Sequence, residues 1–339
     1  MATGCARDLP DTTPKTGLLE PPAVADAAQL TGVGSTFVEP LMRQWVSQYK
    51  AVAPNVAIGY EGAGSAVAVE RFKSGEGQFF TSDVPLSERD EVILGGSQAF
   101  VQAPWAAGAI AVVYNLPDVG ELRLSPGTLS GIFGGRIVRW DEPEIRADNP
   151  NIRLPNLAIQ TIVRSDGSGT TQVFASYLQE TAGWGLGIGF SVRFPRGQGV
   201  RGSEGMTAAV KRISGAIGYV GLAHARQADL PVALLRNEAK RYVGPTPDAV
   251  RAALAGASIR PNGTVAKLYF LPQSPGAYPL STFSYLIVRR TGLDPPVAVA
   301  LRHFAAWALT TGQRSAEALG YVALPRPFAI ASLDAVQQY

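Results

Sequence analysis

The sequence predicts an α/β fold with largely parallel sheets, and three observations lead to that prediction. Short apolar segments alternate along the chain with stretches whose apolar residues recur every three to four positions, the pattern of strands followed by helices. Three of the predicted strand-to-helix junctions are rich in Gly, Ser and Thr, at residues 32–36, 62–65 and 164–171. The chain of 339 residues is longer than one hydrophobic core comfortably supports, so we expect two domains.

The first unit begins near Gln29 with a short strand. The turn 32–36 follows, and its Ser and Thr stand at the head of a helix that has Pro40 in its first turn. Gly32 and Gly34 lack the third glycine of a dinucleotide-binding fingerprint, so the turn does not predict that motif. The helix is identified by the apolar residues of one face, which are Phe37, Leu41, Trp45, Tyr49 and Val52.

The same arrangement of strand, turn and helix follows at once. Strand 55–60 leads into the turn 62–65 and a helix that starts near Ala66. Strand 78–81 then runs almost directly into Asp83. On local grounds alone, the plainest interpretation of this carboxylate is a cap on the following turn.

The middle of the chain is expected to cross between the domains. Residues 99–114 are apolar without a helical period, and we expect a pair of extended segments because Pro104 and Gly108 interrupt the run. A helix at 125–133 follows. Residues 140–155 are rich in Pro and Asn and predict a turn and a loop.

The last of the three Gly-rich junctions carries the most hydrogen-bond donors. The apolar strand 157–163 ends at Arg164, and Ser168 and Thr170 precede the apolar face of a helix. The first N–H groups of a helix lack intrahelical partners and carry partial positive charge, so this helix start attracts anions. Asp166 is expected to orient the guanidinium, with an Asx turn as the alternative. A capped helix start without a ligand is the plain alternative for the whole stretch.

The rest of the chain predicts further α/β structure. A Gly-rich loop spans residues 183–202, and Ser203 is expected to cap the helix after it. The other expected elements are a buried strand at 216–220, a helix at 247–257, an extended stretch at 272–279, a strand at 282–288 and a helix at 296–309.

Composition and motifs argue against several classes of function. The net charge of +3 is small for the length, and Lys and Arg do not cluster with aromatic residues, so nucleic-acid binding is not expected. No stretch reaches the roughly 18 uncharged apolar residues of a membrane span. The two histidines and one cysteine show no metal-ligand spacing, so neither a metal nor a cofactor is expected. The glycines around Ser168 match neither a P-loop nor a nucleophile elbow.

The single cysteine lies very near the start of the sequence. Cys5 ends an Ala-Thr-Gly-Cys run that resembles the end of a bacterial lipoprotein signal, and a Pro- and Thr-rich segment follows it. The apolar part of such a signal does not precede it in this sequence. Either that part lies before residue 1 or the match is chance. On the first interpretation, Cys5 is the lipidation site and the chain lies outside the cytoplasm.

Six short motifs occur along the chain in a fixed order. They lie at residues 32–37, 60–65, 81–86, 164–170, 215–220 and 278–280. Together they resemble the phosphate-binding protein of the bacterial high-affinity phosphate ABC importer, over essentially the whole folded chain. The chain departs from this family where Ala66 and Val67 follow Ser65 in place of glycines, and where the larger Phe80 to Ser82 precede the acid. These departures bear on pocket width and affinity.

The resemblance implies a periplasmic-binding-protein fold of type II character. Two α/β lobes would enclose an anion and would be joined by two extended hinge strands. The expected division is residues 1–28 as a lipid-anchor remnant and flexible linker, 29–105 with 281–339 as the first lobe, 106–280 as the second lobe, and hinges near 104–111 and 275–281.

The resemblance also implies the ligand contacts. The acceptor would be Asp83, which would take a proton that the phosphate carries. The charged donor would be Arg164. The neutral donors would be Thr36, the Phe37 backbone N–H, Ser65, Ser168, the Gly169 backbone N–H and Thr170.

Proton counting supports inorganic phosphate as the ligand. Phosphate retains a proton near neutral pH whereas sulfate has none, so an acceptor carboxylate in a pocket of donors favours phosphate. Arsenate, sulfate and molybdate remain alternative ligands, and arsenate has the same proton count as phosphate. A phosphate-ester enzyme is the alternative from another class, but the sequence shows neither metal ligands nor a paired nucleophile and base. A structural lipoprotein that has lost binding is the third.

The family resemblance finally implies partners and a location. We expect a monomer that works outside the cytoplasm, in the periplasm or at the cell surface, and that passes phosphate to the permease subunits of an ABC transporter in the membrane.

Overall fold

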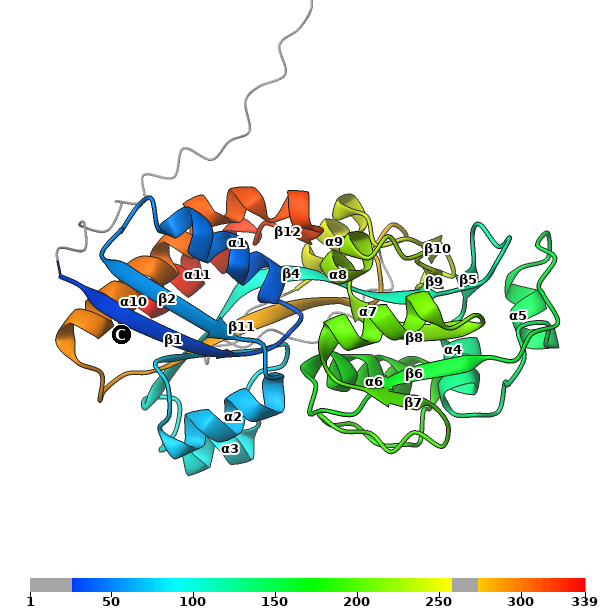
Figure 1. The fold of residues 1–339 in the computed structure, drawn as a ribbon, viewed down its shortest axis with the longest axis horizontal. Coiled ribbons are helices and arrows are strands. Elements are labelled where there is room, and N and C mark those ends of the chain that lie inside the picture. Colours follow the sequence, from blue (N-terminus) through cyan, green and yellow to red (C-terminus); the bar gives the residue numbers. More distant parts are fainter. Residues whose placement is uncertain (1–25, 258–273, 339) are drawn as a thin grey trace, which may run out of the picture.

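The computed structural model describes residues 26–257 and 274–338, so the prediction for Cys5 and the first part of the stretch 272–279 lie outside the described residues. The chain forms two α/β lobes that lie side by side along the long axis (Figure 1). A single sheet runs through both lobes in the order β2-β1-β3-β11-β4-β8-β6-β7, with β12 paired to β4. The α/β class with two lobes, predicted from the sequence, is confirmed.

The first lobe is built on the parallel strands β2, β1 and β3, which helices cover on both faces. The ends of these strands lead into the predicted donor turns. The elements of this lobe are β1 (Ala28–Gly34), α1 (Glu39–Tyr49), β2 (Val56–Glu61), α2 (Ser65–Ser74), β3 (Phe79–Ser82), α3 (Glu88–Ile93), α10 (Pro295–Leu309), the short helices η1 (Thr311–Ser315) and η2 (Glu317–Leu319), β12 (Tyr321–Val322) and α11 (Arg326–Gln337).

The long strand β4 runs through both lobes. In β4 (Phe100–Tyr114), the part up to Ala109 pairs with β11 (Ser281–Arg289), and the part from Ile110 pairs with β8 of the second lobe. The expectation of two separate segments at 99–114 is wrong, because β4 is continuous. Pro104 is tolerated because it lies opposite Tyr285, where the ladder shifts register and a missing N–H interrupts no regular pairing.

The second lobe packs helices around β8, β6 and β7, and a small sheet of β10, β9 and β5 lies beside it. The loop predicted at 140–155 is wrong in part, since Pro143 starts a short helix there. The elements of this lobe are β5 (Arg123–Leu124), α4 (Pro126–Phe133), α5 (Pro143–Asp148), β6 (Gln160–Arg164), α6 (Gly169–Ala182), β7 (Gln198–Val200), α7 (Gly202–Arg212), β8 (Ala216–Gly221), α8 (Leu222–Gln227), β9 (Leu234–Arg236), β10 (Tyr242–Val243) and α9 (Pro247–Leu254).

Aromatic packing holds the helices that begin at the donor turns. Trp45 of α1 packs edge-on against Trp105 of β4 with ring centroids 5.2 Å apart, and both side chains are fully buried. In the second lobe, Phe174 of α6 stacks on Tyr219 of β8 at 4.4 Å. Each of these helices is thereby packed against a strand of the central sheet. Among the described residues, no helix has the length and apolar character needed to cross a membrane.

Candidate functional site

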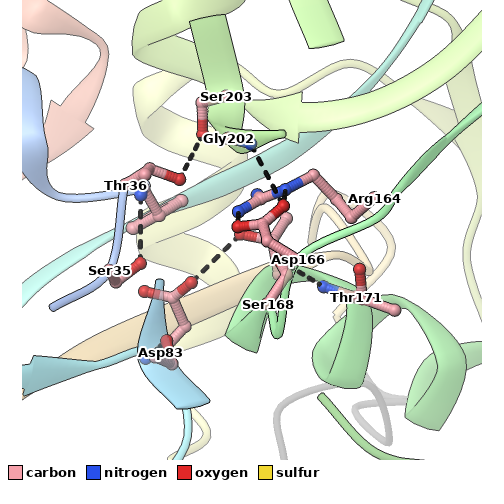
Figure 2. Close-up of polar contacts among 12 residues, drawn as sticks. Ser35, Thr36, Asp83, Arg164, Asp166, Ser168, Thr171, Gly202 and Ser203 are labelled. Carbon is pink, nitrogen blue, oxygen red and sulfur yellow. Dashed lines mark hydrogen bonds and ion pairs between the residues drawn. The ribbon is translucent and has the colours of Figure 1, made fainter. Parts of the chain in front are cut away.

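The predicted site residues of both lobes converge on one small region where the lobes face each other (Figure 2). Thr36 and Asp83 come from the first lobe, and Arg164 and Ser168 come from the second. The site residues predicted to act through their side chains are all buried, although these side chains are polar or charged. As whole residues, their exposed fractions are 5% for Thr36, 1% for Ser65, 2% for Asp83, 7% for Arg164, 1% for Ser168 and 1% for Thr170.

Asp83 lies directly after β3 and is the acidic centre of this region. Its Oδ2 accepts a hydrogen bond from the Thr170 hydroxyl across the two lobes at 3.0 Å. Its backbone N–H donates to the Ser65 hydroxyl at 3.3 Å. Its Oδ1 is buried and has no hydrogen-bond partner among the described residues. A buried acceptor without a partner is costly, so this oxygen is a place where a ligand that donates a hydrogen bond would be stabilised.

The surroundings of Asp83 change its proton affinity. Burial raises the pKa of this carboxyl to about 6, while the hydroxyls of Ser35 and Thr170 and the charge of Arg164 act in the opposite direction. The Ser35 hydroxyl lies near enough to lower the pKa of Asp83, although its geometry is not that of a normal hydrogen bond to Oδ1. Asp83 is therefore ionised at neutral pH and protonated in moderately acidic solution.

Arg164 ends β6 and is held by a carboxylate two residues later. Its Nε donates to Asp166 Oδ1 at 2.7 Å, its Nη2 donates to Asp166 Oδ2 at 2.5 Å, and the Arg164 side chain is only 2% exposed. Burial alone would raise the pKa of Asp166, but the hydrogen bonds and charge of Arg164 hold it below its usual value. The expectation that Asp166 orients Arg164 is confirmed. The remaining guanidinium donors keep a fixed direction because two are held in a fork.

The start of α6 supplies neutral donors to the same region. Ser168 is the N-cap of this helix, and its hydroxyl accepts from the Thr171 N–H at 3.2 Å. This is the capping role expected on local grounds, and it leaves the hydroxyl proton of Ser168 available to donate. At Gly169, an added Cβ would lie 2.4 Å from the Ser65 hydroxyl oxygen and 2.9 Å from Asp83 Cβ. The two lobes thus touch at a position that only glycine fits.

The turn before α1 is arranged differently from expectation. The helix begins at Glu39, so Thr36 and Phe37 lie ahead of it rather than in its first turn. The Phe37 backbone N–H donates to the Ser35 hydroxyl at 3.0 Å. The Thr36 hydroxyl is 2.8 Å from the Ser203 hydroxyl of the other lobe. The expectation that Ser203 caps its helix is wrong, since the N-cap of α7 is Arg201 and no side chain caps it.

Ser35 and Ser203 also lie at this site, although neither was among the predicted site residues. The signal for Ser35 was available, because it directly precedes Thr36 in a donor-rich turn. Nothing local indicated Ser203, since its partner lies 167 residues away. Within the described ranges, no group of three or more His, Cys, Asp or Glu side chains could hold a metal ion.

The donor and acceptor pattern defines what the region can bind. The same region contains hydroxyls, the start of α6 and one oriented guanidinium, together with the Asp83 Oδ1 oxygen, which has no hydrogen-bond partner among the described residues. An oxyanion suits the donors, and a proton on that oxyanion suits the carboxylate. The arrangement therefore favours an oxyanion that carries a proton at neutral pH.

Comparisons with known proteins agree with this pattern. A family model described as the PBP superfamily domain matches residues 21–311. "Phosphate-binding protein PstS" of Xylella fastidiosa is 33% identical over 332 residues, which cover 96% of this chain and 88% of that protein. "Phosphate-binding protein PstS" of Methanocaldococcus jannaschii is 36% identical over 329 residues, covering 89% of this chain and 84% of that protein.

Solved structures show the same fold. The periplasmic phosphate-binding protein PfluDING, bound with phosphate, superimposes with a TM-score of 0.72 at 20% identity and covers 89% of this chain and 92% of its own. A phosphate-binding protein from Stenotrophomonas maltophilia gives a TM-score of 0.66 at 20% identity and covers 91% of this chain and 94% of its own.

Proposed function

We propose that this chain, a member of the PstS family of phosphate-binding proteins within the PBP superfamily, captures inorganic phosphate between its two lobes. It would then deliver the phosphate to an ABC importer. The observation that carries the proposal is the buried Asp83 Oδ1, an acceptor that has no hydrogen-bond partner among the described residues and that lies in the same region as Arg164 and Ser168. Phosphate has the proton that this oxygen lacks.

Each predicted residue has a role in this proposal. The acceptor is Asp83, and Arg164 is the charged donor, held in direction by Asp166. The Phe37 N–H would exchange the Ser35 hydroxyl for an oxygen of the anion. The other donors to the phosphate oxygens would be the hydroxyls of Thr36, Ser65, Ser168 and Thr170 and the backbone N–H of Gly169.

The lobe boundaries form part of the same proposal. The change of partner along β4, from β11 to β8 between Ala109 and Ile110, supports a hinge within residues 104–111. The second hinge would lie at 275–281, just before β11 begins. On this division, residues 29–105 and 281–339 move as one lobe and residues 106–280 as the other.

The wider role follows from the family. The relatives are phosphate-binding proteins by name, and we infer a binding role rather than catalysis for this chain as well. The partner would be the permease subunits of the importer in the membrane, and the place of action would be outside the cytoplasm. Lipid anchoring through Cys5 and a monomeric state complete the proposal.

Calorimetric titration of phosphate-stripped protein tests the ligand assignment. Phosphate is expected to bind most tightly, arsenate more weakly, and sulfate and molybdate far more weakly, because neither of the last two carries a proton for Asp83 at neutral pH. Tighter binding of sulfate or molybdate than of phosphate would overturn the assignment.

Sulfate binding is expected to strengthen as the pH falls through about 6. Above the pKa of about 6, the Asp83 carboxylate repels an anion that has no proton, whereas the protonated carboxyl can donate to a sulfate oxygen. Titration with sulfate at pH 8 and pH 5 should show at least about a tenfold gain in affinity on acidification. The Asp83→Asn protein, whose side chain does not titrate, is the control and should show a much flatter profile. A sulfate affinity of the wild type that does not change with pH would contradict the prediction.

A further inference from the structure

The first turn of α7 makes three contacts that converge on the candidate site or on the opposite lobe. The Gly202 N–H donates to Asp166 Oδ1 at 3.1 Å, which places this turn against the carboxylate that holds Arg164. The Ser203 hydroxyl lies 2.8 Å from the Thr36 hydroxyl of the first lobe (Figure 2). The next side chain, Glu204, forms an ion pair at 3.2 Å with an arginine of α1. One helical turn thus connects the second lobe to the first.

These contacts differ greatly in their surroundings. The ion pair between Arg43 and Glu204 is open to solvent, with 65% and 73% of the two side chains exposed, so it contributes little. Ser203, by contrast, is 1% exposed and Thr36 is 5% exposed. A buried hydroxyl that loses its partner is left unsatisfied, so the Ser203 contact is the one with energetic consequence.

Proton counting assigns a direction to the bond between the two hydroxyls. A threonine hydroxyl has one proton to donate and two lone pairs with which to accept. If Thr36 donates its proton to phosphate, as in the proposed function, it can only accept from Ser203. Ser203 must then be the donor, and its bond holds the Thr36 proton in the direction of the anion.

We propose that Ser203 is a positioning residue for phosphate binding, which acts through Thr36 and only when the lobes are closed; this inference rests on the proposed function. Thr36 and Ser203 belong to different lobes, so their bond forms after the anion has entered and the lobes have met. A contact that forms after closure slows the dissociation of the ligand and leaves its association rate unchanged. Ser203 thereby extends the phosphate site to a helix that makes no proposed contact with phosphate.

The test compares Ser203→Ala with a control one helical turn away. Thr207 is also buried on α7, but its hydroxyl donates only to the carbonyl oxygens of Ser203 and Glu204 in its own helix. In phosphate titration with stopped-flow kinetics, S203A should raise Kd by about three- to tenfold, almost entirely through koff. T207V should stay within about twofold of the wild type. S203C, which keeps a side chain of similar size but donates weakly, should shift Kd in the same direction as S203A.

A double-mutant cycle shows whether Ser203 acts through Thr36. In the T36V background, which has no hydroxyl to orient, S203A should change Kd by less than about twofold. Without phosphate, the unfolding midpoint of S203A should stay near that of the wild type, because the bond is absent when the lobes are open.

Three results would overturn the inference. The first is a Kd of S203A within about twofold of the wild-type Kd. The second is an S203A effect on Kd that is as large in the T36V background as in the wild-type background. The third is a loss of stability in S203A that is the same with phosphate as without it. Failure of the wild type itself to bind phosphate would instead overturn the proposed function, so the two failures are distinguishable.

Discussion

Replacing Gly169 by Ala is expected to raise the phosphate Kd by about a hundredfold while the phosphate-free protein remains folded. The added Cβ would lie 2.4 Å from the Ser65 hydroxyl oxygen and 2.9 Å from Asp83 Cβ, closer than non-bonded atoms approach. Both of these residues belong to the opposite lobe, so the clash exists only when the lobes close. The backbone N–H of residue 169, a proposed phosphate donor, is retained in the variant. The loss of phosphate affinity would therefore measure the free-energy cost of preventing closure of the lobes.

The measurement is a phosphate titration together with thermal unfolding in the absence of phosphate. Gly127→Ala is the matched control, because an added Cβ at this exposed position of α4 meets no atom within 4 Å. Both variants should unfold near the wild-type midpoint without ligand, since alanine suits the first turn of a helix at least as well as glycine. Wild-type affinity in G169A would show that the lobes do not need this close approach.

Asp83→Asn is expected to remove most of the preference for phosphate over sulfate. A site built to accept one particular proton rejects an analogue without that proton by about 10⁴-fold. In the variant, the amide group can turn its NH₂ toward a sulfate oxygen, so sulfate binding should improve. Phosphate binding should weaken less than discrimination does, because the donors of both lobes remain. Competition titrations with phosphate and sulfate at pH 8 measure this ratio directly.

The same substitution is expected to stabilise the protein in the closed arrangement at high pH. The pKa of Asp83 is raised from 3.8 to about 6, so its contribution to stability is fully present below 3.8 and is lost as the pH rises through 6. That change corresponds to about 3 kcal/mol, and asparagine does not undergo it. Asp334→Asn, which removes an exposed carboxylate on α11, is the charge-matched control. It should change neither the preference for phosphate over sulfate nor the stability at high pH. Unchanged sulfate rejection in D83N would contradict the role given to Asp83.

The sequence predicted the α/β class and the donor-rich junctions well, because both depend on short stretches of chain. Ser168 caps α6 and Arg164 ends β6, as residue types a few positions apart indicate. Local reasoning failed where a distant segment decided the outcome. The continuous β4 passes through Pro104 because a register shift in β11 accommodates it. Helix α5 is a miss of another kind, because its cause is local. The Pro and Asn content of residues 140–155 predicted a loop, although Pro143 suits a first helical turn.

By itself, then, the sequence determined the helix starts and strand ends at which the anion donors stand, because these follow from local propensity and periodicity. The role of Asp83 as their acceptor came from the family resemblance of the motifs, and proton counting from residue types supports it. The tertiary structure decided which of these groups already have partners. It pairs Ser203 with Thr36, engages the Phe37 N–H with Ser35, and leaves Asp83 Oδ1 without a donor among the described residues. Burial and the approach of two lobes set these pairings, and both depend on segments far apart in the chain.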